Sequence, residues 1–339
     1  MARPTLKDVA ARAGVSVSTV SYALNERSTL PLAEQTKARI RRIATEIGYV
    51  PNGVARSLQA RSSRSIGVLL NKPLTTPRYA SIAQGIAGGL GARGYHPAFL
   101  DGVAAQRCVE DARGGRLDGL VFIGHDDHEV PEELEHAVLG YGLPFVALDC
   151  GAPRPYPTVD FDYGAGVDDV MAELERRGVR EVLFLRPDLG TRAEREREQA
   201  VMRAMAERPS MTLRTLLNGI TLERMRTIDT TAAAYLPQLL ALVEPILREL
   251  GEEQPKTAVL CAWGADVEAV YRTAQQLGSG ITVASLAAGA LAPSLWPALV
   301  QSRLPLEAAG EACAQLIVEA IAGDSPTEPI LLRPVLETD

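Results

Sequence analysis

Residues 66–336 alternate short apolar strands with helical segments, and no other feature of the chain constrains its fold as strongly. The expected strands are IGVLL, HPAFL, DGLVFI and PFVAL in a first set, and EVLFL, MTLRTLL, TAVLCAW and ITVASL in a second set that follows a crossing segment. Strands that alternate with helices form parallel sheets, because a parallel pair needs a long crossover connection. The two sets therefore predict two α/β lobes with a cleft for a small ligand between them.

Residues 5–24 have the pattern of two short helices joined by a tight turn. Thr5 and Asp8 fit a capping box, and apolar residues then recur at helical spacing until Gly14, a residue suited to ending a helix. Ser16 is the predicted N-cap of the second helix. So short a connection with a glycine is typical of a helix-turn-helix, and a third amphipathic helix follows.

The net charge of −7 is unevenly distributed along the chain. Residues 1–65 hold 11 Lys and Arg against 4 Asp and Glu, whereas the rest of the chain holds 24 against 38. A basic head on an acidic body is the asymmetry expected when one end contacts a polyanion such as DNA. Charge and periodicity leave two alternatives open, a solvated helical surface and a three-helix domain that binds a protein partner.

The segment TLKDVAARAGVSVSTVSYALN, followed by IRRIATEIGYVPNGVARSLQARSS, closely resembles the LacI/GalR family of bacterial transcription regulators. The match covers the whole head without a gap, and the body resembles the family's periplasmic-binding-protein-like effector domain. The resemblance implies an all-α helix-turn-helix DNA-binding domain over residues 1–50, a hinge helix and linker over 51–64, and a two-lobed α/β effector-binding and dimerisation domain over 65–339. It also implies that a last helix, Leu306–Ala322, and a last strand, Ile330–Leu336, help to cross between the lobes.

The resemblance places the second helix of the head in the major groove of DNA, with Val17, Ser18 and Tyr22 at its base-reading positions. Ser18 can hydrogen-bond a base edge, and Val17 can contact a thymine methyl group. Tyr22 stands where an arginine is more usual, which argues against bidentate reading of guanine there. Thr19, Ser21 and Asn25 are expected to hold phosphates. The other DNA contacts that we expect in the head are Thr5, Ser16 and Tyr49.

Residues 52–60 predict a two-turn helix that is too short to be stable alone. In the family that this segment resembles, the hinge helices of two subunits fold together on DNA, and a leucine from each inserts into the central base step. Leu58 matches that leucine, and such an apolar wedge kinks the duplex. The alternative is a linker whose Leu58 packs on the body. The other hinge contacts expected with DNA are Asn52, Val54 and Ala55.

The resemblance also supplies candidates for the effector pocket, which are Arg78, Tyr79, Asp149, Asp162, Arg197 and Trp263. Arg197 matches an arginine that pairs with a sugar hydroxyl or a carboxylate, although the charged run around it also fits a surface helix. Trp263-Gly264 and Ala287-Ala288 replace polar residues that the family commonly has after two strands. Because sugar hydroxyls need carboxylate acceptors, these losses favour a different ligand or none. Trp263 fits either stacking on a flat effector or a place in the core.

Motifs of enzymes and metal sites are absent or misplaced in the sequence. Gly89-Leu-Gly91-Ala-Arg-Gly94 fits the dinucleotide pattern, but it lies at the end of a predicted helix rather than where a strand enters one. His125-Asp126-Asp127-His128 lacks a third spaced ligand and fits a polar loop. Four scattered cysteines predict buried, reduced thiols. Because no signal peptide and no apolar run of about 18 residues occur, we expect a cytoplasmic protein with no membrane role.

These observations predict a sequence-specific regulator, a repressor, that binds a palindromic double-stranded DNA operator as a homodimer. A small-molecule effector between the lobes, a sugar or another metabolite, would change the angle between the lobes and so the fit of the hinge helices. No enzyme activity, cofactor or metal is expected. Two alternatives remain, a regulator without ligand control and a small-molecule-binding protein whose head docks a protein partner.

Overall fold

The computed structural model describes residues 4–24, 32–50, 62–72, 74, 76–101, 105–125, 129–151, 153–221, 223, 237–249, 256–278, 280–287 and 298–338. The chain divides into two compact units, Met1–Ser63 and Arg64–Asp339. Five of the residues expected to contact DNA lie outside the described residues. They are Asn25, Asn52, Val54, Ala55 and Leu58.

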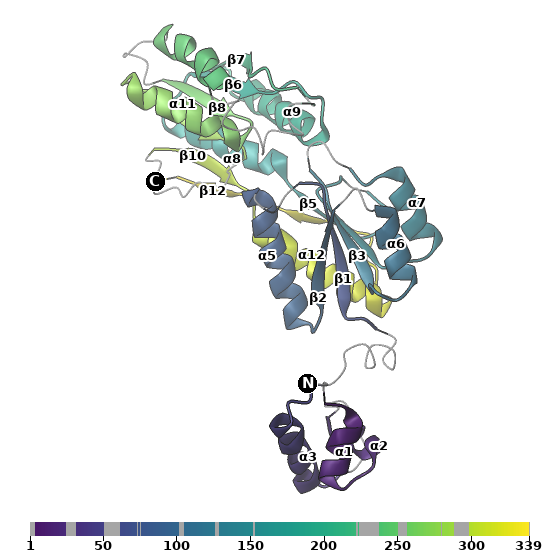
Figure 1. Ribbon diagram of the computed structural model, residues 1–339. Helices are drawn as coiled ribbons and strands as arrows, with labels where there is room; N and C mark the ends of the chain where they lie inside the picture. The colour runs from purple at the N-terminus through teal and green to yellow at the C-terminus, as the bar shows by residue number, and fades with distance from the viewer. Residues whose placement is uncertain are drawn as a thin grey trace. The chain divides into compact units, whose positions relative to one another are not determined.

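The described residues of the first unit form the three helices that the sequence predicts there (Figure 1). They are α1 (Leu6–Ala13), α2 (Val17–Leu24) and α3 (Glu34–Glu46). Their apolar faces meet in a small core in which Val9, Val20 and Ile40 are fully buried. Arg39 on α3 donates from Nη2 to the backbone carbonyl of Ala13 at 2.8 Å. This bond satisfies a carbonyl at the end of α1 and fixes α3 beside the helix-turn-helix.

The signals that the sequence places at the helix ends are present in the structure. The carboxylate of Asp8 accepts from the backbone N–H of Thr5 at 2.7 Å, which forms the predicted capping box. Gly14 follows α1 in the left-handed conformation, with φ 62°. The Ser16 hydroxyl accepts from the backbone N–H of Thr19 at 3.1 Å and so caps α2. These local contacts set the angle at which α2 leaves the turn.

The second unit contains, within its described residues, two six-stranded sheets covered by helices (Figure 1). The first sheet has the order β11-β5-β4-β3-β1-β2 and is parallel throughout. The second has the order β12-β10-β9-β8-β6-β7 and is parallel except for β12, which runs antiparallel to β10. The predicted two-lobed α/β architecture is therefore confirmed.

The elements of the first lobe are β1 (Ser65–Leu70), α5 (Pro77–Ala92), β2 (His96–Asp101), α6 (Ala105–Arg113), β3 (Gly119–Ile123), α7 (Glu132–Gly140), β4 (Phe145–Leu148), β5 (Thr158–Phe161), α12 (Leu306–Ala322) and β11 (Ile330–Leu332). Those of the second lobe are α8 (Tyr163–Arg176), β6 (Glu181–Arg186), α9 (Arg192–Ala206), β7 (Thr212–Leu217), a helix at 237–249, β8 (Thr257–Cys261), α11 (Gly264–Gln276), β9 (Thr282–Ser285), β10 (Val300–Arg303) and β12 (Val335–Glu337). Strands β3, β4 and β8 are buried along their whole length, which is typical of parallel sheets with helices on both faces.

The chain crosses between the lobes from β5 to α8, from β10 to α12 and from β11 to β12. The sequence pattern predicted a crossing segment at the first point, but it missed β5 and α8 themselves. The helix predicted at Leu306–Ala322 is α12, with the same bounds. It packs on α5 and on strands of the first sheet.

The single strand predicted over Ile330–Leu336 is wrong in one respect, because the segment forms two strands in different sheets. Strand β11 pairs with β5 in the first lobe, and β12 pairs with β10 in the second. Pro334 lies between them. Since proline has no backbone N–H, it cannot continue a ladder, and the chain changes sheets at this residue.

The four cysteines, Cys108, Cys150, Cys261 and Cys313, are buried and free, as predicted. In the described part of the chain, no helix is both long enough and apolar enough to cross a membrane. The same residues contain no group of three or more His, Cys, Asp or Glu side chains that could hold a metal ion.

Glycines allow α5 and α12 to approach closely in the first lobe. A Cβ atom on Gly85 would overlap the backbone carbonyl of Glu307, and one on Gly310 would lie 2.7 Å from the backbone nitrogen of Ile86. Gly89 faces the Cβ of Ala314 in the same way, at 2.7 Å. This packing accounts for the first glycine of the dinucleotide-like pattern, which lies in the last turns of α5.

Gly85→Ala should lower the free energy of unfolding by about 1–3 kcal/mol, because backbone atoms of α12 have to move to admit the methyl group. Gly88→Ala is the matched control on the same helix, since nothing lies within 4 Å of its added Cβ. It should be neutral or stabilising by about 0.5–1 kcal/mol, because alanine restricts the unfolded chain. Urea unfolding followed by circular dichroism measures both, and equal effects of the two variants would contradict this account.

Candidate DNA-binding surface and interlobe site

Helix α2 turns one face to the core of the head and leaves the other free. Val20 and Ala23 are buried, whereas Val17 and Tyr22 are 41% and 44% exposed. Ser18 is also exposed. The three residues predicted to read bases thus lie on one outer helix face, where large apolar side chains have no core to stabilise them. Such a surface offers a methyl contact, a hydroxyl and a phenol to the edge of a base pair.

The other head residues predicted to contact DNA have roles within the fold as well. Thr5 belongs to the capping box of α1, and the hydroxyls of Ser16 and Thr19 lie 2.8 Å apart at the start of α2. Tyr49 is half-buried and packs on the core of the head. Ser21 is half-exposed on α2. Their contacts with DNA stay predictions.

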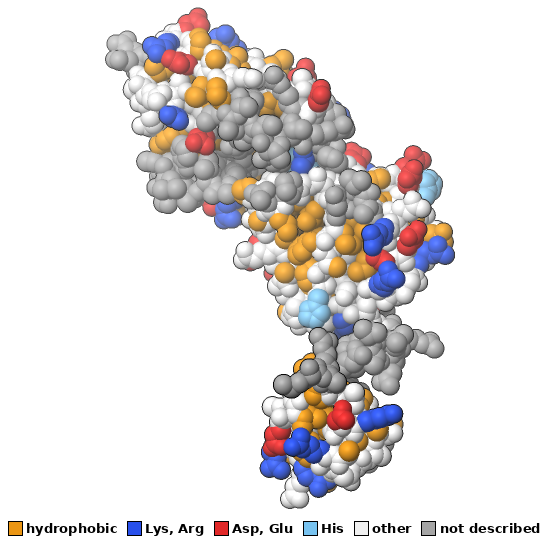
Figure 2. Space-filling view, viewed as in Figure 1, with side chains coloured by type: hydrophobic (Ala, Val, Ile, Leu, Met, Phe, Trp, Pro, Cys, Tyr) orange, Lys and Arg blue, Asp and Glu red, His pale blue; other side chains and the backbone are white. Residues whose placement is uncertain are grey.

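Basic side chains lie on the surface of the head, as Figure 2 shows. The exposed ones among the described residues are Lys7, Arg12, Arg39, Arg41 and Arg42. Lys37 pairs with Glu34 at 2.8 Å, and Arg42 lies 3.6 Å from Glu46. Because surface ion pairs of this kind are weak, these cations remain available to neutralise phosphates.

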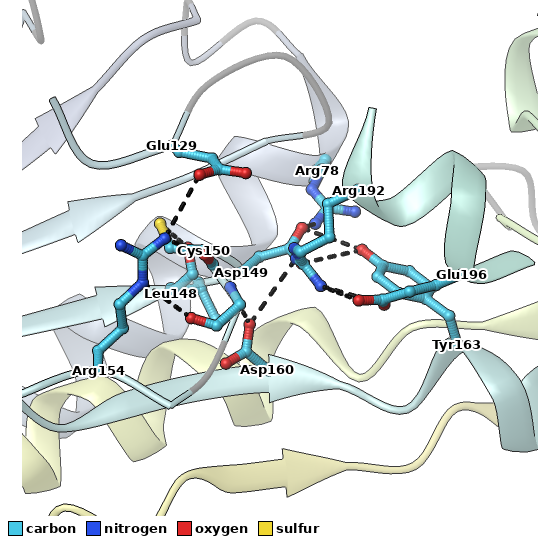
Figure 3. Close-up of polar contacts among 11 residues, drawn as sticks. Arg78, Glu129, Leu148, Asp149, Cys150, Arg154, Asp160, Tyr163, Arg192 and Glu196 are labelled. Carbon is cyan, nitrogen blue, oxygen red and sulfur yellow. Dashed lines mark hydrogen bonds and ion pairs between the residues drawn. The ribbon is translucent and has the colours of Figure 1, made fainter. Parts of the chain in front are cut away.

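The second candidate site is centred on Asp149, which directly follows β4 at the carboxyl end of the first sheet (Figure 3). Its side chain is fully buried. Oδ2 accepts from Nη2 of Arg78 at 2.6 Å, and Oδ1 accepts from Nη2 of Arg192 at 2.7 Å. The Tyr163 hydroxyl donates to the same carboxylate, at 3.0 Å from Oδ2 and 3.1 Å from Oδ1. One buried carboxylate therefore holds two guanidinium groups and a phenol.

These three partners come from both lobes. Arg78 lies in the first turn of α5 in the first lobe, whereas Tyr163 and Arg192 are the first residues of α8 and α9 in the second lobe. Side chains from the first turns of three helices thus converge on Asp149. Asp149 is consequently a junction between the lobes as well as a candidate ligand contact.

The backbone around Asp149 is shaped for this arrangement. Asp149 has φ 55° and Gly151 has φ 76°, both in the left-handed region. A Cβ atom on Gly151 would lie 2.8 Å from Cδ of Arg192, so only glycine lets that side chain pass. Arg154 donates to the carbonyls of Cys150 and Gly151 at 3.1 and 3.2 Å and thereby fixes the loop from the other side.

Two acidic side chains surround Arg192 in addition to Asp149. Nη1 of Arg192 lies 3.0 Å from Glu196, and Nη2 lies 3.8 Å from Asp160. Oδ1 of Asp160 accepts from the backbone N–H of Gly151 at 2.9 Å. Burial raises the pKa of Asp160 above its usual value. The second guanidinium, that of Arg78, lies 5.3 Å above the ring of Phe161.

The charged run that begins α9 is only partly a surface feature. Glu194 is buried, accepts from Arg186 at 2.7 Å and also accepts from the backbone N–H groups of Leu189 and Gly190. These bonds hold the loop between β6 and α9 and so position Arg192. Arg197 is 2% exposed, and its guanidinium carbon lies 4.2 Å above the ring of Tyr163. The surface-helix interpretation is therefore wrong for Arg197, whereas its role in effector binding stays a prediction.

The remaining predicted pocket residues lie apart from this cluster or have other contacts. Tyr79 is fully buried and stacks on His125, with ring centroids 6.2 Å apart. Asp162 caps α8 through Ala165. Trp263 precedes α11 and is buried in a core cluster of the second lobe, in agreement with the core interpretation.

The structure brings Arg78, Asp149 and Arg197 around Tyr163. Sequence reasoning missed two members of the cluster, Tyr163 and Arg192. The signal for them in the sequence is their position. Each is the first residue of a helix that follows a parallel strand, β5 for Tyr163 and β6 for Arg192, and so lies near the carboxyl edge of that strand's sheet.

Comparison with known proteins shows similarity along the entire chain. The family model described as "Bacterial regulatory proteins, lacI family" matches residues 5–52. The HTH-type transcriptional regulator CelR of Thermobifida fusca is 27% identical over 352 residues, which cover 99% of this chain and 96% of the relative. The Lac repressor dimer bound to operator and the anti-inducer ONPF has a TM-score of 0.73 at 20% identity, with 99% and 98% of the two chains covered. A CelR–cellobiose complex has a TM-score of 0.61 at 22% identity, with 99% of both chains covered.

Arg192→Met should lower the free energy of unfolding by about 2 kcal/mol, because a buried carboxylate loses one of its charged donors. Arg203→Met, at an exposed position on the same helix, should change it by less than about 0.5 kcal/mol. Chemical unfolding of the full chain gives both values. A loss in the Arg192 variant no larger than that of the control would show that the cross-lobe pair does not stabilise the second unit.

Proposed function

Because the chain belongs to the lacI family of bacterial regulatory proteins, we propose that it is a repressor that binds a palindromic operator as a homodimer. A small molecule bound between the lobes modulates its affinity for DNA. The observation that carries the proposal is the outer face of α2, where Val17, Ser18 and Tyr22 are exposed beside the turn of a helix-turn-helix. A two-fold symmetric dimer presents two such faces and therefore reads a two-fold symmetric site.

The base contacts follow from the chemistry of this face. Val17 contacts a thymine methyl group, and the Ser18 hydroxyl bonds a base edge. Tyr22 contributes a phenol in place of the guanidinium that would read guanine in a bidentate way. The exposed cations of the head supply the affinity that is independent of sequence. Leu58, outside the described residues, acts as the wedge at the centre of the operator.

Ligand control is supported by the junction at Asp149. The cluster joins the first turns of α5, α8 and α9, so a ligand that enters it changes how the lobes meet. Such a rotation alters the spacing of the two hinge segments in a dimer and hence their fit to DNA. The similar CelR has a structure with cellobiose, and the similar Lac repressor has one with operator and an anti-inducer, which supports a sugar-like effector here.

A regulator without ligand control is the second candidate. One observation favours it, because both oxygens of Asp149 already accept from side chains of the chain itself. The lobes are then held together without a ligand. Thermal shifts of the full chain across a metabolite panel separate the two candidates, since only a ligand-controlled protein is stabilised by one of the compounds.

Fluorescence anisotropy of the full chain on its own promoter region tests DNA binding. The wild type should bind a palindrome in preference to scrambled DNA, with an affinity that falls steeply with salt. Tyr22→Ala should weaken operator binding about tenfold and leave binding to scrambled DNA unchanged, because only base contacts are lost. Leu58→Ala should weaken the operator complex as well.

Gln35→Ala, at an exposed position on α3, is the control and should bind like the wild type. Equal affinity of the wild type for the palindrome and the scrambled DNA would overturn sequence-specific recognition. Binding of neither DNA at low salt would favour a head that docks a protein partner.

A further inference from the structure

Arg64 is the first residue of the second unit and directly precedes β1, and its backbone lies in the left-handed region with φ 57°. This conformation is unfavourable for any residue with a Cβ atom. Among the non-glycine residues that the structure describes, only Asp149 and Ala298 share it. A strained backbone persists only where the surrounding contacts hold it, so the contacts of Arg64 indicate what its conformation is for.

Three neighbouring residues of the first lobe fix both the backbone and the side chain of Arg64. Its backbone N–H donates to Oδ2 of Asp118 at 3.0 Å, and its carbonyl accepts from the backbone N–H of His96 at 2.8 Å. Its guanidinium carbon lies 5.0 Å above the ring of Tyr95, a buried residue in a core cluster of this lobe. Arg64 is thus held on both sides of its Cα atom and at the end of its side chain.

Two of these contacts do more than begin a strand. The ladder of β1 begins with the bond from His96 to the Arg64 carbonyl and the bond from the Asp118 backbone N–H to the Ser65 carbonyl, each at 2.8 Å. The Asp118 carboxylate and the Tyr95 ring contact Arg64 in addition to this ladder. A strand that only had to start here would not need a strained arginine, because glycine takes the same φ at no cost. The additional contacts therefore fix the direction in which the chain leaves β1 towards residue 63.

This direction matters because residues 1–63 form the separate unit that contains the helix-turn-helix. In a dimer on a palindrome, each head is joined to its body at Arg64, so both heads reach their half-sites from these two anchored residues. We propose that Arg64 is a positioning residue for operator recognition, and that its anchor sets the spacing between half-sites that the dimer accepts. The proposal rests on the proposed function, because it requires a dimer that binds a palindrome.

The size of the effect follows from the lengths of a residue and of a base pair. A residue that is released from its contacts adds at most about 3.5 Å to the reach of an extended chain. One base pair adds about 3.4 Å to the separation of two half-sites. Release of Arg64 alone therefore lengthens the free connection of each subunit by as much as one base pair. The anchor is thus tight enough to decide between operators that differ by one base pair in spacing.

Arg64→Gly tests the proposal, because glycine keeps the left-handed backbone and removes the side chain that rests on Tyr95. Fluorescence anisotropy measures binding of the full chain to the palindrome that the wild type selects from its promoter region, and to versions with one base pair added or removed at the centre. Either change should weaken wild-type binding at least about tenfold, because both heads can no longer engage together. In Arg64→Gly the same changes should weaken binding by no more than about threefold.

Two further variants connect the result to the contacts of Arg64. Arg64→Lys keeps a cation over the Tyr95 ring and should discriminate between spacings like the wild type. Asp118→Ala removes the carboxylate that accepts from the Arg64 N–H and should relax the spacing in the same direction as Arg64→Gly. The midpoint of thermal unfolding of Arg64→Gly should lie within about 2 °C of the wild-type value, because the relief of strain offsets the lost contacts.

Arg113→Gln is the matched control, because the Arg113 guanidinium carbon lies 3.9 Å above the ring of Tyr141 in the same lobe. This variant loses one positive charge and one contact between a cation and an aromatic ring, as Arg64→Gly does. Arg113 belongs to α6, however, and not to the segment that leads to the head. The control should therefore keep the wild-type discrimination between spacings.

Tolerance of the altered spacings by Arg64→Gly, but not by Arg64→Lys or Arg113→Gln, supports the positioning role. If Arg64→Gly loses as much affinity as the wild type does, if the wild type itself tolerates the altered spacings, or if Arg113→Gln relaxes them equally, the positioning role is overturned and the regulator stands. If the wild type binds the palindrome no better than scrambled DNA, the proposed function fails and the positioning role falls with it.

Discussion

The ion cluster around Asp149 is the interaction on which the arrangement of the second unit depends. A fully buried carboxylate is tolerated only when charged or polar donors replace water, and here two of its three partners belong to the other lobe. Removing a partner from a buried pair is strongly destabilising, so separation of the lobes, which would remove both Arg192 and Tyr163, has a large electrostatic cost at this point. The left-handed backbone of Asp149 and the absence of a side chain at Gly151 both serve to bring Arg192 within reach.

The covalent links between the two lobes limit the motions that can change the ion pairs of this cluster. Among the elements that the structure describes, the chain crosses between the sheets at three places, and one of them is the short link through Pro334 that joins β11 to β12. Three short crossings permit rotation of one lobe against the other but not separation. Under the proposed function, a ligand that alters the contacts of Arg78 or Arg192 would change the angle between the lobes.

The local parts of the structure were predictable from the sequence, and the non-local parts were not. The capping box at Thr5 and the turn at Gly14 follow from signals within a few residues, whereas the bounds of α12 were given by the family resemblance. Strand β5 has four residues, and its burial depends on β4 and β11, which are distant in sequence, so no local pattern marks it. Pro334 is a local signal for the break between β11 and β12, but the apolar residues on both sides of it fit one continuous strand.

The two candidate sites also differ in how far the sequence predicts them. On α2 the burial of Val20 and Ala23 fixes which side chains face outward, so helical spacing agrees with the outward positions that the family resemblance gave to Val17, Ser18 and Tyr22. In the run RAEREREQ nearly every residue is polar, and spacing cannot tell which charges turn inward. Glu194 is buried because it holds the loop after β6, and Arg197 is buried because its guanidinium lies over the ring of Tyr163, which opens another helix of the same lobe. When the partner of a buried charge is distant in sequence, as Tyr163 is from Arg197, the residues around the charge do not show that it is buried.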